Sequence, residues 1–169
     1  VVQRYKDLEF KRPKYYRNTI LAEWTLDSEG RIYDGWPIYD FMQDTPEFTV
    51  YGLDFGYGGK DSTALIKIDY YQGSWYCTEI FNKAEMRISE TIVAMKVAGV
   101  PSNAKIYADY AVPTFLTEIR LGGFSGVRKC KKGKVDVELK KIQDKSIIII
   151  DSDKSSQLYF GYIMWKYDK

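Results

Sequence analysis

A change of hydrophobic periodicity after residue 48 is the feature that most constrains the fold. Thr49 to Phe55 is a short apolar run, and a glycine-rich turn separates it from Ser62 to Tyr70, which alternates as a strand does. A second turn at Gln72 and Gly73 leads into a third β-run, Trp75 to Phe81. Consecutive runs joined by tight turns predict a three-stranded antiparallel meander.

After the meander, helical and strand-like patterns alternate along the chain. Glycine and proline at 99 and 101 end the first helical segment, and two glycines end the second. The predicted elements are a helix whose apolar face carries Ile88, Ile92, Met95 and Val97, a strand from Ala104 to Ala108, a helix from Pro113 to Gly122, a strand from Ser125 to Lys129, a helix from Lys134 to Gln143, a strand from Ser146 to Ile150 and an amphipathic helix from Ser155 onward.

Three antiparallel strands followed by parallel strands joined through helices form the layout of RNase H-like domains. The predicted fold class is therefore α/β, an RNase H-like mixed sheet with helices on both faces. In this layout the first strand and the strand after the first helix lie side by side at the centre of the sheet.

Residues 1–48 lack this order, because Pro13, Pro37 and Pro46 interrupt any long element. We expect a linker or docking segment over 1–48 and the RNase H-like domain over 49–169. Tyr15 to Trp24 fits either a short helix or an irregular segment packed on a neighbour. Since the chain begins at Val1 rather than Met, we expect that it was excised from a longer polypeptide or that the true start is missing.

Composition excludes several kinds of chemistry. The chain has no histidine, which removes the commonest general base and zinc ligand and every Ser-His or Cys-His pair. The spacing of Cys77 and Cys130 matches no zinc or redox pattern, so we expect a reducing compartment. No apolar run approaches the roughly 20 residues of a membrane span. The net charge of +2 does not by itself indicate a nucleic-acid partner.

Two aspartates stand where neighbouring strands are predicted to end. Asp54 closes the first strand, and Asp109 follows the strand from Ala104 to Ala108. Each alone fits a turn or helix cap, but two at one edge of a sheet favour a ligand site. Mg²⁺ is often held by one or two carboxylates with water and phosphate, and two ions about 3.5–4 Å apart can hydrolyse a phosphodiester.

The run from Gly52 to Tyr57, followed by Asp61 to Leu65, resembles the opening nuclease motif of the large terminase subunits of tailed phages. The run from Ile106 to Pro113, continuing to Gly122, is similar to the second motif of that family. Upstream, Tyr15 to Trp36 resembles the family's connection from the ATPase motor into the nuclease. The resemblance thus extends over almost the whole chain.

The resemblance implies a Mg²⁺- or Mn²⁺-dependent endonuclease that cuts concatemeric double-stranded DNA during viral packaging. Asp54 and Asp109 would be the catalytic metal ligands of a two-ion site, and Asp61 is a weaker candidate that coordinates through water or steadies the glycine turn. The implied partners are double-stranded DNA, the terminase ATPase domain, the small terminase subunit and the portal. The implied setting is the host cytoplasm, without a membrane.

The chain departs from the family at its end. The family supplies a third carboxylate beyond the final helix, and we expect the domain to be truncated before it. Asp151 and Asp153 fit loop residues after a strand, Asp168 fits an exposed terminus, and Gly161 stands where the family usually has an acidic residue. The chain also contains no phosphate-binding loop of an ATPase.

A basic cluster follows the strand from Ser125 to Lys129. It can neutralise DNA phosphates without reading bases, or it is a solvated surface loop. The residues assigned to DNA are Arg128, Lys129, Lys131, Lys132 and Lys134, with Lys140, Lys141 and Lys145 extending the positive stretch.

Three interpretations of the chain as a whole stay open. It is a metal endonuclease, a catalytically incomplete module that binds DNA or motor partners, or another RNase H-like enzyme.

Overall fold

The computed structural model describes residues 36–56, 61–109, 113–131, 133–153, 155, 156 and 158, all within one unit of the chain that spans residues 32–165. The predicted helix over Tyr15 to Trp24 and the position of Lys132 lie outside the described residues. Of the predicted helix after Ser155, only Leu158 is described as helical. The division of the chain at residue 48 stays a prediction.

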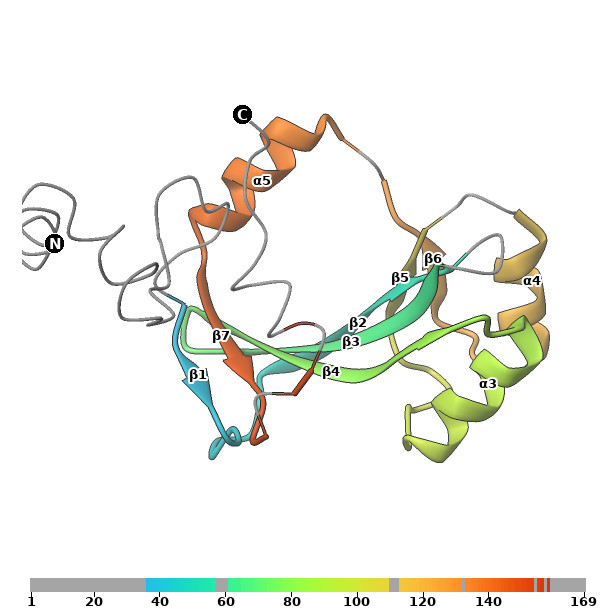
Figure 1. Ribbon diagram of the computed structural model, residues 1–169, viewed down its shortest axis with the longest axis horizontal. Coiled ribbons are helices and arrows are strands. Elements are labelled where there is room, and N and C mark those ends of the chain that lie inside the picture. The colour runs from blue at the N-terminus through green and yellow to red at the C-terminus, as the bar shows by residue number, and fades with distance from the viewer. Residues whose placement is uncertain are drawn as a thin grey trace, which may run out of the picture. The chain divides into compact units, whose positions relative to one another are not determined.

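The described residues form one mixed sheet of seven strands in the order β1-β7-β4-β3-β2-β5-β6 (Figure 1). None of the described helices is long and apolar enough to cross a membrane. The elements are β1 (Ile38–Tyr39), β2 (Phe48–Asp54), β3 (Ser62–Tyr71), β4 (Ser74–Ala84), α3 (Ile88–Val97), β5 (Ile106–Ala108), α4 (Pro113–Leu121), β6 (Val127–Lys129), α5 (Val135–Gln143) and β7 (Ser146–Ile150).

The pairing of the strands confirms the predicted fold class. β2, β3 and β4 form the antiparallel meander, with a register shift between Leu65 and Ile66. β5 pairs parallel with β2, so the first meander strand and the strand after the first helix are neighbours, as predicted. The remaining pairs, β5 with β6, β4 with β7 and β1 with β7, are also parallel. β1 adds two residues from the segment predicted to be a linker.

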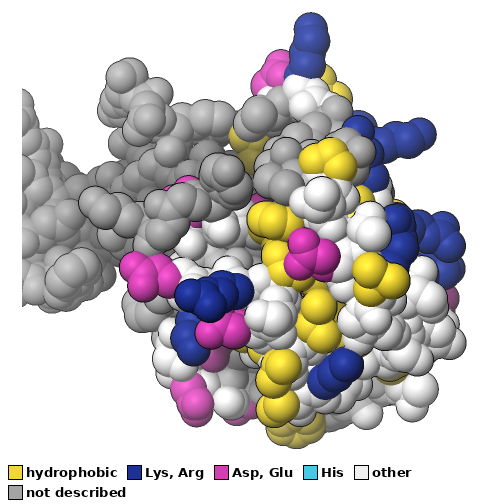
Figure 2. Space-filling view, turned by 90° about the vertical axis from the view of Figure 1, so that its right-hand side faces the viewer, with side chains coloured by type: hydrophobic (Ala, Val, Ile, Leu, Met, Phe, Trp, Pro, Cys, Tyr) yellow, Lys and Arg dark blue, Asp and Glu magenta, His cyan; other side chains and the backbone are white. Residues whose placement is uncertain are grey.

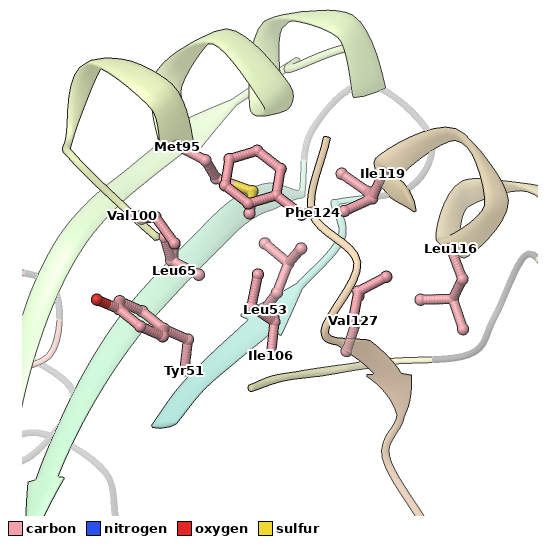
Figure 3. Close-up of a cluster of buried hydrophobic side chains, with 11 residues drawn as sticks. Tyr51, Leu53, Leu65, Met95, Val100, Ile106, Leu116, Ile119, Phe124 and Val127 are labelled. Carbon is pink, nitrogen blue, oxygen red and sulfur yellow. The ribbon is translucent and has the colours of Figure 1, made fainter. Parts of the chain in front are cut away.

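One face of the central strands is covered by α3 and α4 and forms the main hydrophobic core (Figure 3). β5 contributes Ile106 and Ala108, α3 contributes Met95 and α4 contributes Ile119, none with measurable exposure. Each fully buried large aliphatic side chain stabilises the fold by roughly 1.5–3 kcal/mol. α5 lies on the other side of the sheet, so helices cover both faces (Figure 1).

Two details of the sequence prediction are corrected. Val97 is 83% exposed and is not part of the apolar face of α3. It follows Met95 by two residues, about 200° around the helix, which turns it away from the core. β5 and β6 each begin two residues later than predicted, at Ile106 and Val127, and Ser125 and Gly126 lie in a turn before β6.

Candidate metal centre

Asp54 and Asp109 stand at the same level of two neighbouring parallel strands. Asp54 is the last residue of β2, and Asp109 directly follows β5. Leu53 and Ala108 are register partners, and the Asp109 backbone N–H donates to the Leu53 carbonyl oxygen at 3.1 Å. Because neighbouring strands lie about 4.8 Å apart, the two aspartates occupy adjacent positions at one end of the strand pair.

Both aspartates face away from the core. Leu53 and Ala108 are buried in the cluster under α3 and α4, and side chains alternate between the two faces of a sheet. Asp54 is exposed and Asp109 is half-buried. Both line one pocket of about 440 Å³, and its other lining residues are Gly52, Leu53, Ala64, Ile66, Ile68, Tyr107 and Cys130.

The end of β2 is fixed by contacts on both sides of the chain. The Phe55 ring packs edge-on against Phe115 of α4, with centroids 5.3 Å apart. The Gly56 N–H donates to Oγ1 of the buried Thr63 at 3.1 Å. A Cβ on residue 56 would lie 2.1 Å from the Asp61 carbonyl oxygen, so only glycine fits this crossing. These contacts hold Asp54 in place beside Asp109.

The structure places Asp61 against Gly56 rather than among the pocket residues. It is exposed directly before β3, with its backbone against Gly56, and it does not line the pocket. Its assignment as a metal ligand stays a prediction. Among the described residues no group of three or more His, Cys, Asp or Glu side chains is arranged to hold a metal ion. Within the described residues the candidate centre comprises the carboxylates of Asp54 and Asp109, a pair that fits Mg²⁺ or Mn²⁺ completed by water and phosphate.

Asp151 and Asp153 make local contacts after β7. Asp151 follows β7, three strands away from β2. Its carboxylate accepts hydrogen bonds from the Ser155 N–H at 3.4 Å and from the Ser156 N–H and hydroxyl at 3.0 and 2.6 Å. Burial opposes ionisation of Asp151, but the hydrogen bonds from Ser156 and Ser155 outweigh it and lower the pKa of the carboxyl. Asp153 accepts a hydrogen bond from Ser152, and Asp168 lies outside the described residues.

The basic cluster begins on the edge strand next to β5. Arg128 and Lys129 are exposed in β6, and Arg128 is the register partner of Tyr107. Lys131 is exposed after the strand, and Lys134 is exposed at the start of α5. Figure 2, a view onto the end of the unit that carries α3 and α4, shows Lys and Arg side chains on both sides of a broken band of hydrophobic ones, with a larger group at the right. The cluster thus adjoins the pocket through Cys130, which lines it.

The positive stretch along α5 is weaker than its sequence suggests. Lys141 donates to Glu138 at 2.9 Å, so part of its charge is balanced within the helix. Lys140 and Lys145 are exposed.

Sequence reasoning did not assign the other residues that line the pocket, among them Gly52, Tyr107 and Cys130. Gly52 and Tyr107 each precede an aspartate by two residues, so the period of two places them on the same face. Their place in the pocket could therefore have been predicted from the sequence. The place of Cys130 beside Asp109 could not, because it depends on the pairing of β5 with β6.

A meander followed by parallel strands, with two aspartates at the ends of the central parallel pair, defines an RNase H-like fold with a candidate divalent-metal centre. Solved structures of phage terminases share this fold. The large terminase (g2p) nuclease domain from bacteriophage SPP1 with bound Mn matches at 20% identity and a TM-score of 0.70, over 81% of this chain and 82% of that one. The P22 large terminase nuclease domain matches at 14% identity and a TM-score of 0.63, over 85% and 82%.

A longer relative extends the comparison. A large terminase from a thermophilic bacteriophage, solved in complex with ATP-gamma-S, matches at 20% identity and a TM-score of 0.60, over 99% of this chain but 45% of that one. The chain thus spans less than half the length of this terminase. No protein-family model and no curated protein matches the sequence. At these identities the likeness establishes the shared fold, and the resemblance expected from the sequence is confirmed at that level.

Proposed function

We propose that the chain is the divalent-metal-dependent endonuclease domain of a viral DNA-packaging terminase, which cleaves double-stranded DNA by phosphodiester hydrolysis. The observation that carries the proposal is the placement of Asp54 and Asp109 at one level of neighbouring strands, both lining one pocket. The fold adds support, since the SPP1 domain was solved with Mn and the nuclease of thermophilic phage G20c, at a TM-score of 0.53, with cobalt.

In this proposal Asp54 and Asp109 hold Mg²⁺ or Mn²⁺, and a two-ion site would supply an activated water and stabilise the leaving oxygen. Carboxylate oxygens are the ligands that these hard cations prefer. The two side chains project on the face that carries no α3 or α4, so a DNA backbone reaches them without disturbing the core. No histidine takes part, because the chain has none.

Arg128, Lys129, Lys131 and Lys134 neutralise phosphates beside the pocket in this proposal, and we assign Lys132 to the same group from its sequence position. Contacts of this kind position a duplex without reading its sequence. That property suits an enzyme that cuts packaged DNA with little sequence preference.

The wider context follows from the likeness to large terminases. We infer that the domain works with an ATPase domain on the same polypeptide, with a small terminase subunit and with a portal, in the host cytoplasm. The match to the ATP-gamma-S complex, in which this chain corresponds to less than half of a large terminase, supports a preceding motor domain.

A second candidate is a module that binds DNA or motor partners without cutting. It is favoured by one observation, the lack of a third metal-binding side chain near Asp54 and Asp109 among the described residues.

A plasmid-nicking assay separates the two candidates. With Mn²⁺ the wild type should convert supercoiled DNA to the nicked form, EDTA should stop it, and Asp54→Asn should abolish it. Asp153→Asn, a change outside the pocket, is the matched control and should cut normally. Salt-dependent DNA binding without any nicking would select the second candidate.

A further inference from the structure

Gly52 stands inside a central strand where the described part of the protein does not require a glycine. Its φ is not in the left-handed region, and a Cβ at this position would meet no heavy atom of the described residues within 4 Å. Gly56 and Gly126 differ, because backbone atoms would meet their Cβ at 2.1 and 2.0 Å. A strand-interior glycine costs roughly 0.5–1 kcal/mol relative to alanine. A strand-interior glycine often marks a bulge, a bend, or a site where a ligand or another backbone approaches closely.

Gly52 belongs to a row of register partners that crosses three neighbouring strands of the sheet. Gly52 is the register partner of Tyr107, and Tyr107 is the register partner of Arg128. We call these three residues the Gly52 row. Parallel register partners project on the same face, so the row shares the face of Asp54 and Asp109. It precedes them by two residues, or about 6.6 Å along the strands.

Tyr107 and Arg128 are both open to solvent in this row. Tyr107 is 41% exposed although its neighbours Ile106 and Ala108 are completely buried, and it lines the pocket with Gly52. Arg128 is exposed on the neighbouring edge strand. The Gly52 row therefore presents three groups in order: the bare backbone of Gly52, the phenol ring of Tyr107 and the guanidinium of Arg128.

This sequence of groups matches the chemistry of a DNA strand. Bare backbone admits a bulky chain, a tyrosine ring packs on a sugar while its hydroxyl reaches a phosphate, and arginine pairs with phosphate through two parallel hydrogen bonds. We propose that the Gly52 row seats the sugar-phosphate backbone next to the bond cut at Asp54 and Asp109. The proposal rests on the proposed function and makes Gly52, Tyr107 and Arg128 positioning residues.

The test fills the space over Gly52. Gly52→Leu should weaken binding of a fluorescent DNA duplex by about tenfold, measured by anisotropy in EDTA so that the result does not depend on any metal. Thermal unfolding should occur no lower than in the wild type, because the Cβ of the new side chain would meet no heavy atom of the described residues within 4 Å. Ala84→Leu adds the same side chain at an exposed strand end outside the pocket and should bind DNA as the wild type does.

Two further variants keep the test decisive if Gly52→Leu does not fold. Arg128→Gln should reduce the slope of log affinity against log salt by about 0.9, the value of one lost phosphate contact. Tyr107→Ala should weaken DNA binding at unchanged salt slope. A merely structural role would move the melting temperature of these variants and leave both binding readouts unchanged.

The outcomes separate the row from the metal centre. The proposal that the Gly52 row binds the DNA backbone is overturned if Gly52→Leu binds DNA with wild-type affinity. It is also overturned if the wild type does not bind DNA. If Gly52→Leu loses DNA affinity while Asp54→Asn still nicks plasmid, the row stands and the metal centre is wrong. If Asp54→Asn stops nicking while Gly52→Leu binds normally, the metal centre stands and the row is wrong.

Discussion

The two faces of β2 and β5 are built from alternate residues of the same short stretches, yet the faces differ in burial and in polarity. On the face toward α3 and α4, Leu53, Ile106 and Ala108 are almost completely buried. On the other face, Asp54 and Tyr107 are exposed around a pocket. Since a slip of one residue would exchange the faces, the buried face fixes the register that aligns the two aspartates.

Carboxylates on the two faces differ in the same way. Asp69, on the core face at the other end of the meander, is 4% exposed, accepts a hydrogen bond from the Thr49 hydroxyl at 2.5 Å and forms an ion pair with Lys67 at 2.7 Å. A buried charge is tolerated only with such partners. Asp54 instead stands at an exposed strand end beside a second acid. The contacts of Asp69 indicate a structural role, and the exposed position of Asp54 is compatible with the proposed metal centre.

The largest expected effect comes from removing the core side chain at the start of β5, next to Tyr107 in the sequence. Ile106→Ala should lower the free energy of unfolding by about 2–5 kcal/mol, the cost of a large cavity, as measured by urea denaturation. The matched change on the other face, Tyr107→Ala, should cost clearly less. Equal losses in the free energy of unfolding for the two variants would contradict the claim that one face forms the core and the other the pocket.

The glycines give a contrast of intermediate size. Gly56→Ala forces a Cβ against the Asp61 backbone and should destabilise the protein by about 1–3 kcal/mol, the usual cost of overpacking. Gly52→Ala meets open space and should be neutral or should stabilise by about 0.4–1 kcal/mol. Chemical denaturation of both variants is the measurement, and a neutral Gly56→Ala would show that the turn relaxes freely.

The smallest effect concerns acid stability. Because hydrogen bonds lower the pKa of Asp151 in the folded protein, its contribution is fully present above the unfolded value of about 3.9 and is lost as pH falls through the folded pKa. Asp151→Asn should cost about 1 kcal/mol at neutral pH, and this difference from the wild type should shrink below about pH 4. Urea unfolding at both pH values checks this, and a difference that is constant with pH would argue against an ionised Asp151 cap.

Much of the fold could be predicted from the sequence because burial imposes periodicity. The meander, the adjacency of β2 and β5 and the shared level of Asp54 and Asp109 all follow from the period of two and from the order of elements. β1 could not be predicted, because two residues carry no pattern and Ile38 pairs only through β7. The role of Asp151 depended on serines four and five residues further on, whose contacts the local sequence does not determine.

The pocket itself was only half predictable. Asp54 and Asp109 were readable because they end strands, whereas the open space over Gly52 requires the positions of all its neighbours. The close approach of Gly56 to the Asp61 backbone likewise depends on positions that no local sequence pattern fixes. Strand pairing can be predicted from sequence when the two faces of a sheet differ in burial. The open space over a single residue cannot be predicted in this way.

Binding of Mn²⁺ tests the central claim most directly, because it reads the two aspartates without requiring cleavage. By calorimetry the wild type should bind Mn²⁺, and Asp54→Asn and Asp109→Asn should each weaken binding beyond the roughly 10–100-fold that loss of an outer partner costs. Asp153→Asn should bind as the wild type does. Mn²⁺ binding that is unchanged in both Asp54→Asn and Asp109→Asn would contradict a metal centre at the ends of β2 and β5.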